Sequence, residues 1–356
     1  MKKICFFISS VELAGGTERV CSAIANKLAE LGWQVSVLSM YGDVSFFPLR
    51  SEIQVACVFQ KKQSSKFLPY TVFKIRGLLT TLNPEILVSV DSAMFVYAFV
   101  SSWWLGIKHL VWEHFNFHVS LGSRIRTIAR KLAAKYSAII VTLTVGDKEE
   151  WKTNLKCKSK LVTIANPSPF TPMSVELINR KPVVLAVGRI TYQKGFDRLL
   201  NAWKTVTLQI DTNWKLHIVG SGEDEQLLSE KVEALGIAAS VRLIPRTANI
   251  KSHYMESSIF CLSSRFEGFP MVLLEAQSFG LPLVSYNCKT GPAEIINDGN
   301  GILIEDGNEQ LMADALIKLM GDRELRTEMG SRSLRNSHKF DINVIVGQWT
   351  ALLNTM

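Results

Sequence analysis

Two glutamates that lie eight residues apart, Glu267 and Glu275, are the side chains best placed for chemistry, because a loop that turns into a helix carries both. Pro270 suits a first helical turn, whose amides have no partner within the helix, and Gly268 lets another backbone come close. Such amides attract anions, and the spacing brings both carboxylates to one side. Carboxylates beside an anion site are suited to hydroxyl groups, as an acidic residue binds a ribose. The stretch therefore predicts a site for a nucleotide sugar.

A simpler alternative is that Glu267 caps the helix and Glu275 is a solvated surface charge. Another loop argues against it. Arg189 and Lys194 follow the apolar run 183–187, where the carboxyl end of a strand is expected. Two cations on a short glycine-containing loop are suited to a diphosphate and would stabilise negative charge on a departing group. A charged surface turn is the other interpretation of this loop.

In the N-terminal half, a glycine turn and a histidine also come just after expected strands. Gly15 and Gly16 follow the apolar run 4–9 and precede a helical pattern, so a ligand oxygen could approach the helix amides, with Thr17 or a neighbour as the expected cap. The dinucleotide fingerprint G-x-G-x-x-G is absent, which argues against a nicotinamide enzyme. His114 follows the apolar run 109–112, at a strand end that faces the ligand in parallel sheets. A histidine packed in the core is the alternative.

These residues need a fold in which strand ends meet, and the pattern of both halves predicts one. Strands alternate with helices throughout, which indicates a parallel, right-handed wound sheet in each half. With 356 residues the chain is long enough for two domains. Three prolines in the stretch 165–172 mark a stiff linker, where we place the boundary. The fold class expected is α/β.

Composition limits the class of protein further. The net charge is +8, and the basic excess lies in the N-terminal half. Cations alternate with apolar residues from Arg124 to Lys135, a pattern suited to anionic lipid or phosphate, although a solvated helix face explains it equally. The uncharged stretch Ser92–Ile107 is too short to span a membrane, so we expect a core helix or an interfacial segment. The six cysteines are scattered and are expected to be reduced, and no metal-type cluster is seen. No signature for nucleic-acid binding is found.

Taken together in their order, these motifs resemble the retaining glycosyltransferases of family 4, which have the GT-B architecture of two Rossmann-like parallel-sheet domains facing a central cleft. The motifs that carry the resemblance are Gly15-Gly16 with Glu18 and Arg19, Glu113-His114, Asn166-Pro167, Gly188-Arg189, Lys194-Gly195, Gly220-Ser221-Gly222, Glu267-Gly268-Phe269-Pro270 and Glu275-Ala276. They span nearly the whole chain.

The resemblance implies three segments: an acceptor-side domain of residues 1–168, a nucleotide-sugar domain of residues 169–338, and a helix of residues 339–356 that crosses back to the first domain. It implies that Glu267, His114, Arg189 and Lys194 are catalytic. It also implies a donor-binding set of Gly15, Gly16, Arg189, Lys194, Glu267, Gly268, Phe269, Pro270, Met271 and Glu275. In this set Arg189 and Lys194 hold the diphosphate, Glu275 the ribose, and Glu267 with the backbone after it the sugar.

The implied activity is transfer, with retention, of a hexose or N-acetylhexosamine from a UDP-sugar to a lipid-linked or lipopolysaccharide or O-antigen saccharide. No cofactor is expected, since the UDP-sugar is a co-substrate, and no metal is expected, since nothing in the chain resembles an aspartate-rich metal site. The expected location is cytoplasmic, peripheral on the inner face of the cytoplasmic membrane, with anionic lipid as a partner. A nucleotide-sugar epimerase or hydrolase of the same fold is the alternative. A non-catalytic sugar-binding protein is disfavoured by the intact set of charged residues.

Overall fold

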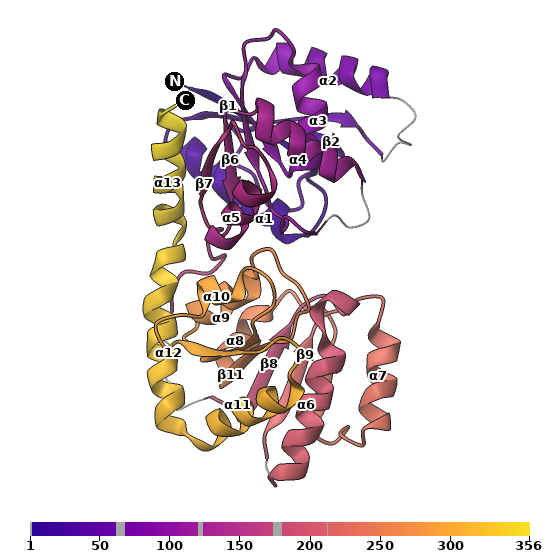
Figure 1. Cartoon of the computed structure of the whole chain (residues 1–356), viewed down its shortest axis with the longest axis vertical. Coiled ribbons are helices and arrows are strands. Elements are labelled where there is room, and N and C mark those ends of the chain that lie inside the picture. The colour runs from indigo at the N-terminus through magenta and orange to yellow at the C-terminus, as the bar shows by residue number, and fades with distance from the viewer. Residues whose placement is uncertain (1, 62–67, 120–123, 174–179, 212) are drawn as a thin grey trace. The chain divides into compact units, whose positions relative to one another are not determined.

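The computed structural model describes residues 2–61, 68–119, 124–173, 180–211 and 213–356. The chain forms two compact units, one of Met1–Pro167 with Ile342–Met356 and the other of Ser168–Asp341 (Figure 1). The break between them lies in the proline-containing stretch that the sequence indicated as a linker. Both units are built around a parallel sheet, as the alternation of strands and helices predicted.

The first unit has a seven-stranded sheet in the order β3-β2-β1-β4-β5-β6-β7. Its elements are β1 (Lys3–Ser10), α1 (Gly16–Glu30), β2 (Gln34–Tyr41), β3 (Gln54–Phe59), α2 (Leu68–Leu82), β4 (Ile86–Val90), α3 (Ser92–Ser101), β5 (Lys108–Trp112), α4 (Arg124–Tyr136), β6 (Ile139–Thr142), α5 (Val145–Asn154), β7 (Lys160–Thr163) and α13 (Ile342–Asn354). The inner strand β1 is apolar and buried from Ile4 to Ile8, as expected for a strand that packs on both faces. Phe7 packs into the core cluster that α2 and α3 line, whereas Phe6 contacts Trp112 on the other face.

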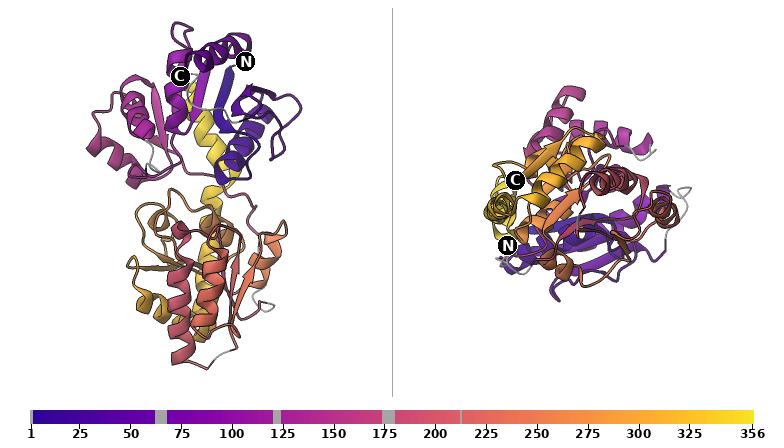
Figure 2. Two further views of the ribbon diagram at one scale, coloured as in Figure 1. Left: turned by 90° about the vertical axis from the view of Figure 1, so that its right-hand side faces the viewer. Right: turned by 90° about the horizontal axis from the view of Figure 1, so that it is seen from below.

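The last helix, α13, belongs to this first unit, where it lies beside α1 (Figure 2). Trp349 is fully buried, and its ring packs edge-on against Trp112 at a centroid distance of 4.8 Å. The amino group of Lys2 donates a hydrogen bond of 3.2 Å to the carbonyl oxygen of Leu353. The apolar face of α13 therefore covers a sheet whose strands all lie in the first half of the chain.

The second unit has a six-stranded sheet in the order β10-β9-β8-β11-β12-β13. Its elements are β8 (Val183–Val187), the 3₁₀ helix η3 (Tyr192–Lys194), α6 (Phe196–Gln209), β9 (Lys215–Val219), α7 (Glu225–Ala234), β10 (Val241–Ile244), α8 (Ile250–Glu256), β11 (Ile259–Leu262), α9 (Met271–Ser278), β12 (Leu283–Tyr286), α10 (Pro292–Ile295), β13 (Gly301–Ile304), α11 (Glu309–Gly321), α12 (Arg323–Ser337) and the 3₁₀ helix η4 (His338–Phe340).

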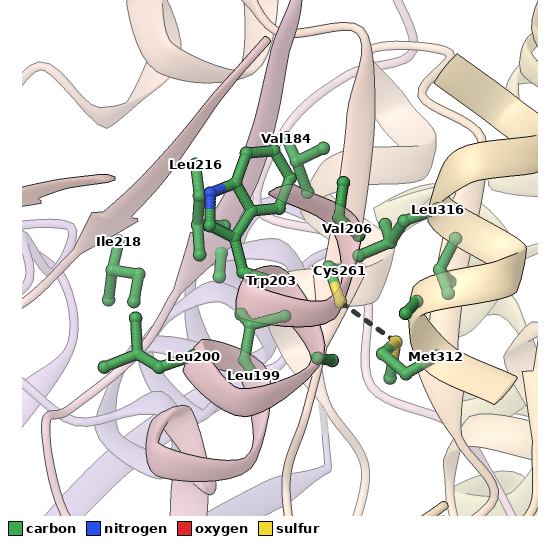
Figure 3. Packing of buried hydrophobic residues seen from close by; sticks show 14 of the residues in the cluster. Val184, Leu199, Leu200, Trp203, Val206, Leu216, Ile218, Cys261, Met312 and Leu316 are labelled. Atoms are coloured by element: carbon green, nitrogen blue, oxygen red, sulfur yellow. Dashed lines mark hydrogen bonds between the residues drawn. The ribbon is translucent and has the colours of Figure 1, made fainter. Parts of the chain in front are cut away.

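The core of the second unit lies between this sheet and the helix pair α6 and α11 (Figure 3). Trp203 of α6 is fully buried there, with Val184 and Leu216 of the sheet in the same cluster. Its indole Nε1 donates to Ser240 Oγ at 3.0 Å, so the one polar atom of the ring is satisfied. Met312 of α11 accepts a weak hydrogen bond from the thiol of Cys261 on β11 at 3.5 Å. The core thus holds the strands that carry the candidate site.

Two local expectations need correction or comment. Thr17 does not cap α1: Gly15 is the N-cap residue, and no side chain caps the helix. The Ser92–Ile107 stretch forms α3 and a turn, and in the described part of the chain no helix is long and apolar enough to cross a membrane. Trp103 and Trp104, which follow α3, are 51% and 90% exposed. The interfacial interpretation of this stretch therefore stays open.

Candidate active site

The candidate site of the second unit lies at the carboxyl ends of β8 and β11. These strands pair with each other at the centre of the sheet, and β8 also pairs with β9, so the chain order reverses here. In open parallel sheets ligands bind outside the carboxyl ends of the strands at such a switch point. The loop after β8 carries Arg189 and Lys194, and the loop after β11 carries Glu267. Strand pairing therefore brings together two motifs that are 73 residues apart in sequence.

Backbone and side-chain hydrogen bonds join the two loops directly. The amide of Arg265 donates to the carbonyl of Gln193 at 2.8 Å, and Gln193 Nε2 donates to the carbonyl of Phe266 at 3.1 Å. Ser263 Oγ donates to the carbonyl of Lys194 at 2.9 Å. Gly195 is required at this junction, because its φ is +61° and a Cβ there would lie 2.2 Å from the carbonyl oxygen of Ser263.

Arg265 strengthens this junction, and the sequence assigned it no role. Its guanidinium donates two hydrogen bonds, of 2.7 and 2.6 Å, to the carboxylate of Asp197 in the first turn of α6. It also lies over the ring of Tyr192 at 4.1 Å, a cation–π geometry. The pairing lowers the pKa of Asp197, because the hydrogen bond from Arg265 favours the ionised carboxylate. Arg265 thus holds the Lys194 loop against the Glu267 loop.

Lys194 and Glu267 form an ion pair. Lys194 Nζ lies 2.6 Å from Glu267 Oε1, and Ser264 Oγ donates to the same oxygen at 2.6 Å. The Glu267 side chain is 7% exposed. Its second oxygen, Oε2, has no hydrogen-bond partner among the residues that the structure describes. One carboxylate oxygen is therefore fixed by protein groups, and the other could accept a hydrogen bond from a ligand.

Glu275, in the second turn of α9, is also buried, at 7% exposure. Its Oε2 accepts a hydrogen bond of 2.7 Å from the hydroxyl of Tyr254. The interpretation of Glu275 as a solvated surface charge is therefore wrong. The interpretation of Glu267 as a helix cap is also wrong, because Pro270 is the N-cap residue of α9 and no side chain caps that helix.

The remaining predicted donor-site residues differ in exposure. Arg189 is exposed and Gly268 is partly buried. The side chain of Phe269 is 7% exposed and packs against Phe340 at 5.9 Å, so only its backbone faces the loop. Met271 opens α9, and its N-terminal amides lack a side-chain acceptor, which suits a ligand oxygen. Thr290, which had no role predicted from the sequence, donates a hydrogen bond of 3.0 Å to the carbonyl of Glu267 and so helps to fix the backbone of this loop.

In the first unit, Gly15 and Gly16 lie at the start of α1, and the side chain of Glu18 lies beside Gly15. A Cβ at Gly15 would lie 2.3 Å from Glu18 Oε2, so the glycine makes room for this carboxylate. Glu18 is itself buried, at 8% exposure. A carboxylate in the first turn already complements the positive end of the helix dipole. The helix end therefore holds a negative side chain at the place where the sequence suggested a ligand anion.

His114 follows β5 in the first unit. Its ring lies 4.5 Å from that of Trp112, and its Nε2 atom is buried without a hydrogen-bond partner among the described residues. Burial lowers the pKa of His114 to about 3, because the imidazolium would lose its hydration. The ring is therefore neutral at physiological pH and could donate or accept one hydrogen bond, but it is a poor proton donor in this state.

Two arginines of α4 face the interior and not solvent, so they do not belong to the lipid-binding or solvated face that the sequence predicted for the cations from Arg124 to Lys135. Arg126 Nη2 bonds to Asp91 Oδ2 at 2.7 Å, and Arg130 Nε lies 3.3 Å from Glu113 Oε2. Burial raises the pKa of Asp91 to about 6, and the nearby Glu113 acts in the same direction. The strand-end acids are buried and need cationic partners, which draws these arginines inward.

No cluster of three or more His, Cys, Asp or Glu side chains that could hold a metal ion occurs within the described ranges. Metal independence stays a prediction for solution experiments to decide.

Comparisons with known proteins agree with this arrangement. Residues 14–168 match the family model described as Glycosyltransferase Family 4, and residues 171–335 match that of Glycosyl transferases group 1. The chain is 36% identical to an uncharacterized glycosyltransferase of Haemophilus influenzae, over 99% of this chain and 100% of the relative. It is 26% identical to a Campylobacter jejuni transferase whose name gives an α-1,4-N-acetyl-D-galactosaminyl transfer to a diphosphoundecaprenol-linked saccharide, over 99% of this chain and 98% of the relative.

The solved structures support the fold. Anabaena HepE in complex with UDP superposes with a TM-score of 0.82 at 17% identity, covering all of both chains. The expected GT-B fold of two Rossmann-like parallel-sheet domains is confirmed. With the matches to both halves of the family and a relative of 36% identity over the full length, the chain belongs to the glycosyltransferases of family 4 and group 1.

Proposed function

We propose that this glycosyltransferase moves a hexose or N-acetylhexosamine from a UDP-sugar to a lipid-linked or lipopolysaccharide or O-antigen saccharide, with retention and without a metal ion. The observation that carries the proposal is the Lys194–Glu267 pair at the meeting point of β8 and β11. A cation suits the donor diphosphate, and a carboxylate beside it suits the sugar. The lipid-linked acceptor named for the Campylobacter relative and the UDP bound to the Anabaena protein support the choice of substrates.

The proposed roles are those that the family resemblance implies, and the strand-end position of the residues is compatible with them. Arg189 and Lys194 bind the diphosphate, Glu275 the ribose, and Glu267 with the first amides of α9 the sugar. In the reaction the bond between the anomeric carbon and the phosphate oxygen breaks, and its electron pair stays on the leaving UDP. The acceptor hydroxyl attacks on the same face and gives its proton to that phosphate oxygen. The cations stabilise the charge that grows on the leaving group. His114, Gly15 and Gly16 stay proposed site residues of the first unit.

A panel of UDP-sugars tests this proposal. We expect one of them to protect the protein against thermal unfolding, since a ligand at 100 times its Kd stabilises the folded state by about 2.7 kcal/mol. The same donor should be turned over, slowly by hydrolysis or faster with an acceptor, equally with and without EDTA. The transferred sugar should keep its anomeric configuration by NMR.

Three results would contradict parts of the proposal. An inverted product excludes retention. Turnover that EDTA abolishes and Mg²⁺ or Mn²⁺ restores excludes metal independence. Conversion of a UDP-sugar to its epimer, or release of its sugar with every saccharide acceptor ignored, favours the alternative epimerase or hydrolase.

We also propose that the first unit binds the inner face of the cytoplasmic membrane through the outer surface of α3 and α4. The exposed apolar side chains of this surface are Val100, Trp103, Trp104, Ile125, Ile128 and Tyr136. Phe99 joins them, since its ring packs against those of Trp103 and Tyr136 at 5.5 and 4.9 Å. Lys131 and Lys135 are exposed on the same helix, and neither helix contains an acidic residue. Aromatic rings beside lysines suit an anionic lipid interface.

Vesicle flotation tests this surface. Wild-type protein should float with phosphatidylglycerol vesicles at low salt and be released at high salt, because each surface cation contributes ~1 kcal/mol that salt screens. Replacing Lys131 and Lys135 by alanine should weaken binding by about 30-fold. Alanines at Lys251 and Lys318, exposed cations of the second unit, serve as the control and should change nothing. The proposal would be contradicted if the protein does not bind the vesicles at low salt. It would also be contradicted if high salt leaves the protein on the vesicles and only detergent releases it.

A further inference from the structure

The hydroxyl of Tyr254 is one of the groups that hold Glu275. Tyr254 lies on α8, its side chain is fully buried, and its hydroxyl donates to Glu275 Oε2 at 2.7 Å. The two residues are 21 positions apart in sequence, on the helices that precede and follow β11 in the chain. No motif in the sequence pointed to this tyrosine. The contact is a hydrogen bond to an acidic side chain, a type that is stronger than one between neutral groups.

The ring of Tyr254 is itself fixed by an aromatic stack. It lies parallel to the ring of Phe279, with an interplanar angle of 3° and a centroid distance of 5.5 Å. Phe260 and Phe170 pack around it at 5.8 and 6.2 Å. A tyrosine held on several sides has little freedom, so its hydroxyl presents one direction to the carboxylate.

Arg180 ties the backbones of this stack together. Its guanidinium donates to the carbonyl oxygens of Tyr254 at 3.3 Å and of Ser257 at 2.7 Å, and also to that of Phe279. These contacts link the end of α8 to the residue that follows α9. The position of the tyrosine relative to the helix that carries Glu275 is therefore set by a partly buried cation as well as by ring packing.

We infer that Tyr254 is a positioning residue of the nucleotide site, which orients the Glu275 carboxylate for the ribose hydroxyls. The inference rests on the proposed role of Glu275. A carboxylate on a short helix can rotate about its side-chain torsions, and each rotation that a ligand must freeze lowers its affinity. The tyrosine removes that freedom before the nucleotide arrives. It touches the carboxylate and acts on the nucleotide only through it.

The experiment replaces Tyr254 by phenylalanine, which removes the hydroxyl and keeps the ring in its stack. UDP binding measured by calorimetry should weaken by about 10-fold, the scale of one hydrogen bond to a charged group. The donor KM should rise in parallel, while kcat should change less than about twofold. A matched control is Tyr286→Phe, since Tyr286 is also fully buried in the second unit and its hydroxyl has no partner among the described residues. That control should bind UDP like the wild type.

Glu275→Gln and the double variant separate this inference from the role of Glu275. If Tyr254 acts through Glu275, the double variant should bind UDP no more weakly than Glu275→Gln alone, because the carboxylate to be oriented is already gone. Additive losses, or Tyr254→Phe with unchanged UDP affinity while Glu275→Gln weakens it, would overturn the inference. If Glu275→Gln itself leaves UDP affinity unchanged, the proposed ribose contact fails and the inference with it. If Tyr254→Phe weakens UDP binding only to the extent that its lower Tm leaves less folded protein, the tyrosine is purely structural and the inference fails.

Discussion

Replacing Glu267 by glutamine is expected to lower kcat by ~10²-fold or more, the ~2.7–4 kcal/mol scale of one preorganised electrostatic partner, while donor binding survives. Positive charge develops at the anomeric carbon as the donor bond breaks, so the contribution of a carboxylate grows toward the transition state. Glutamine has nearly the same shape and can still accept the hydrogen bond from Ser264. The loss should therefore appear in turnover at saturating donor and not in KM.

The control for this variant is Glu256→Gln. Glu256 forms an ion pair with Lys181 at the same N···O distance of 2.6 Å, but its side chain is 53% exposed and lies away from the strand-end loops. Removing that charge should leave kcat and KM unchanged. Circular dichroism and thermal unfolding must show that both variants are folded. If Glu267→Gln keeps full turnover while Glu275→Gln abolishes it at saturating donor, the two roles are reversed.

Lys194→Ala is expected to lower kcat by a similar factor of ~10² and also to weaken UDP, because the leaving diphosphate is bound through this cation in the ground state and gains charge during cleavage. It should also destabilise the fold, since the buried Glu267 carboxylate would lose its ion-pair partner. Arg189→Ala should reproduce the loss of UDP affinity and turnover without the loss of stability, because Arg189 is exposed.

The double variant Lys194→Ala with Glu267→Gln distinguishes catalysis from folding. It removes both charges of the pair, so thermal stability should return most of the way to the wild-type value while turnover stays low. Lys181→Ala, which breaks the exposed pair with Glu256, is the matched control and should change neither property. Full UDP affinity in a folded Lys194→Ala protein would show that the diphosphate binds elsewhere.

Much of this protein could be predicted from local sequence. The alternation of apolar strands and amphipathic helices determined two parallel sheets, because a strand buried on both faces has a continuous apolar run, as in β8 and from Ile4 to Ile8 of β1. The positions of Arg189, Lys194, Glu267 and His114 just beyond strand ends followed from the same pattern. Glycines and prolines in short spacings then indicated the loops that carry these residues, since proline fixes φ and glycine allows backbone conformations that other residues avoid.

Only the tertiary structure decided which of these groups meet. The order of strands places β8 beside β11, and that long-range pairing creates the Lys194–Glu267 contact and the clamp from Arg265 to Asp197. Tyr254 reaches Glu275 because two helices pack against the same part of the sheet, a relation that sequence spacing does not encode.

The direction of charged side chains was likewise a tertiary outcome. Periodicity located the cations of α4, but buried acids at the ends of β4 and β5 turned Arg126 and Arg130 inward and left Ile125 and Ile128 outside. The apolar face of α13 predicted a partner surface without identifying it. In the fold, this face packs against the first sheet, where Trp349 contacts Trp112. Local sequence sets the period and polarity of each element, whereas the partner of each face depends on the burial and charge of residues far away in the chain.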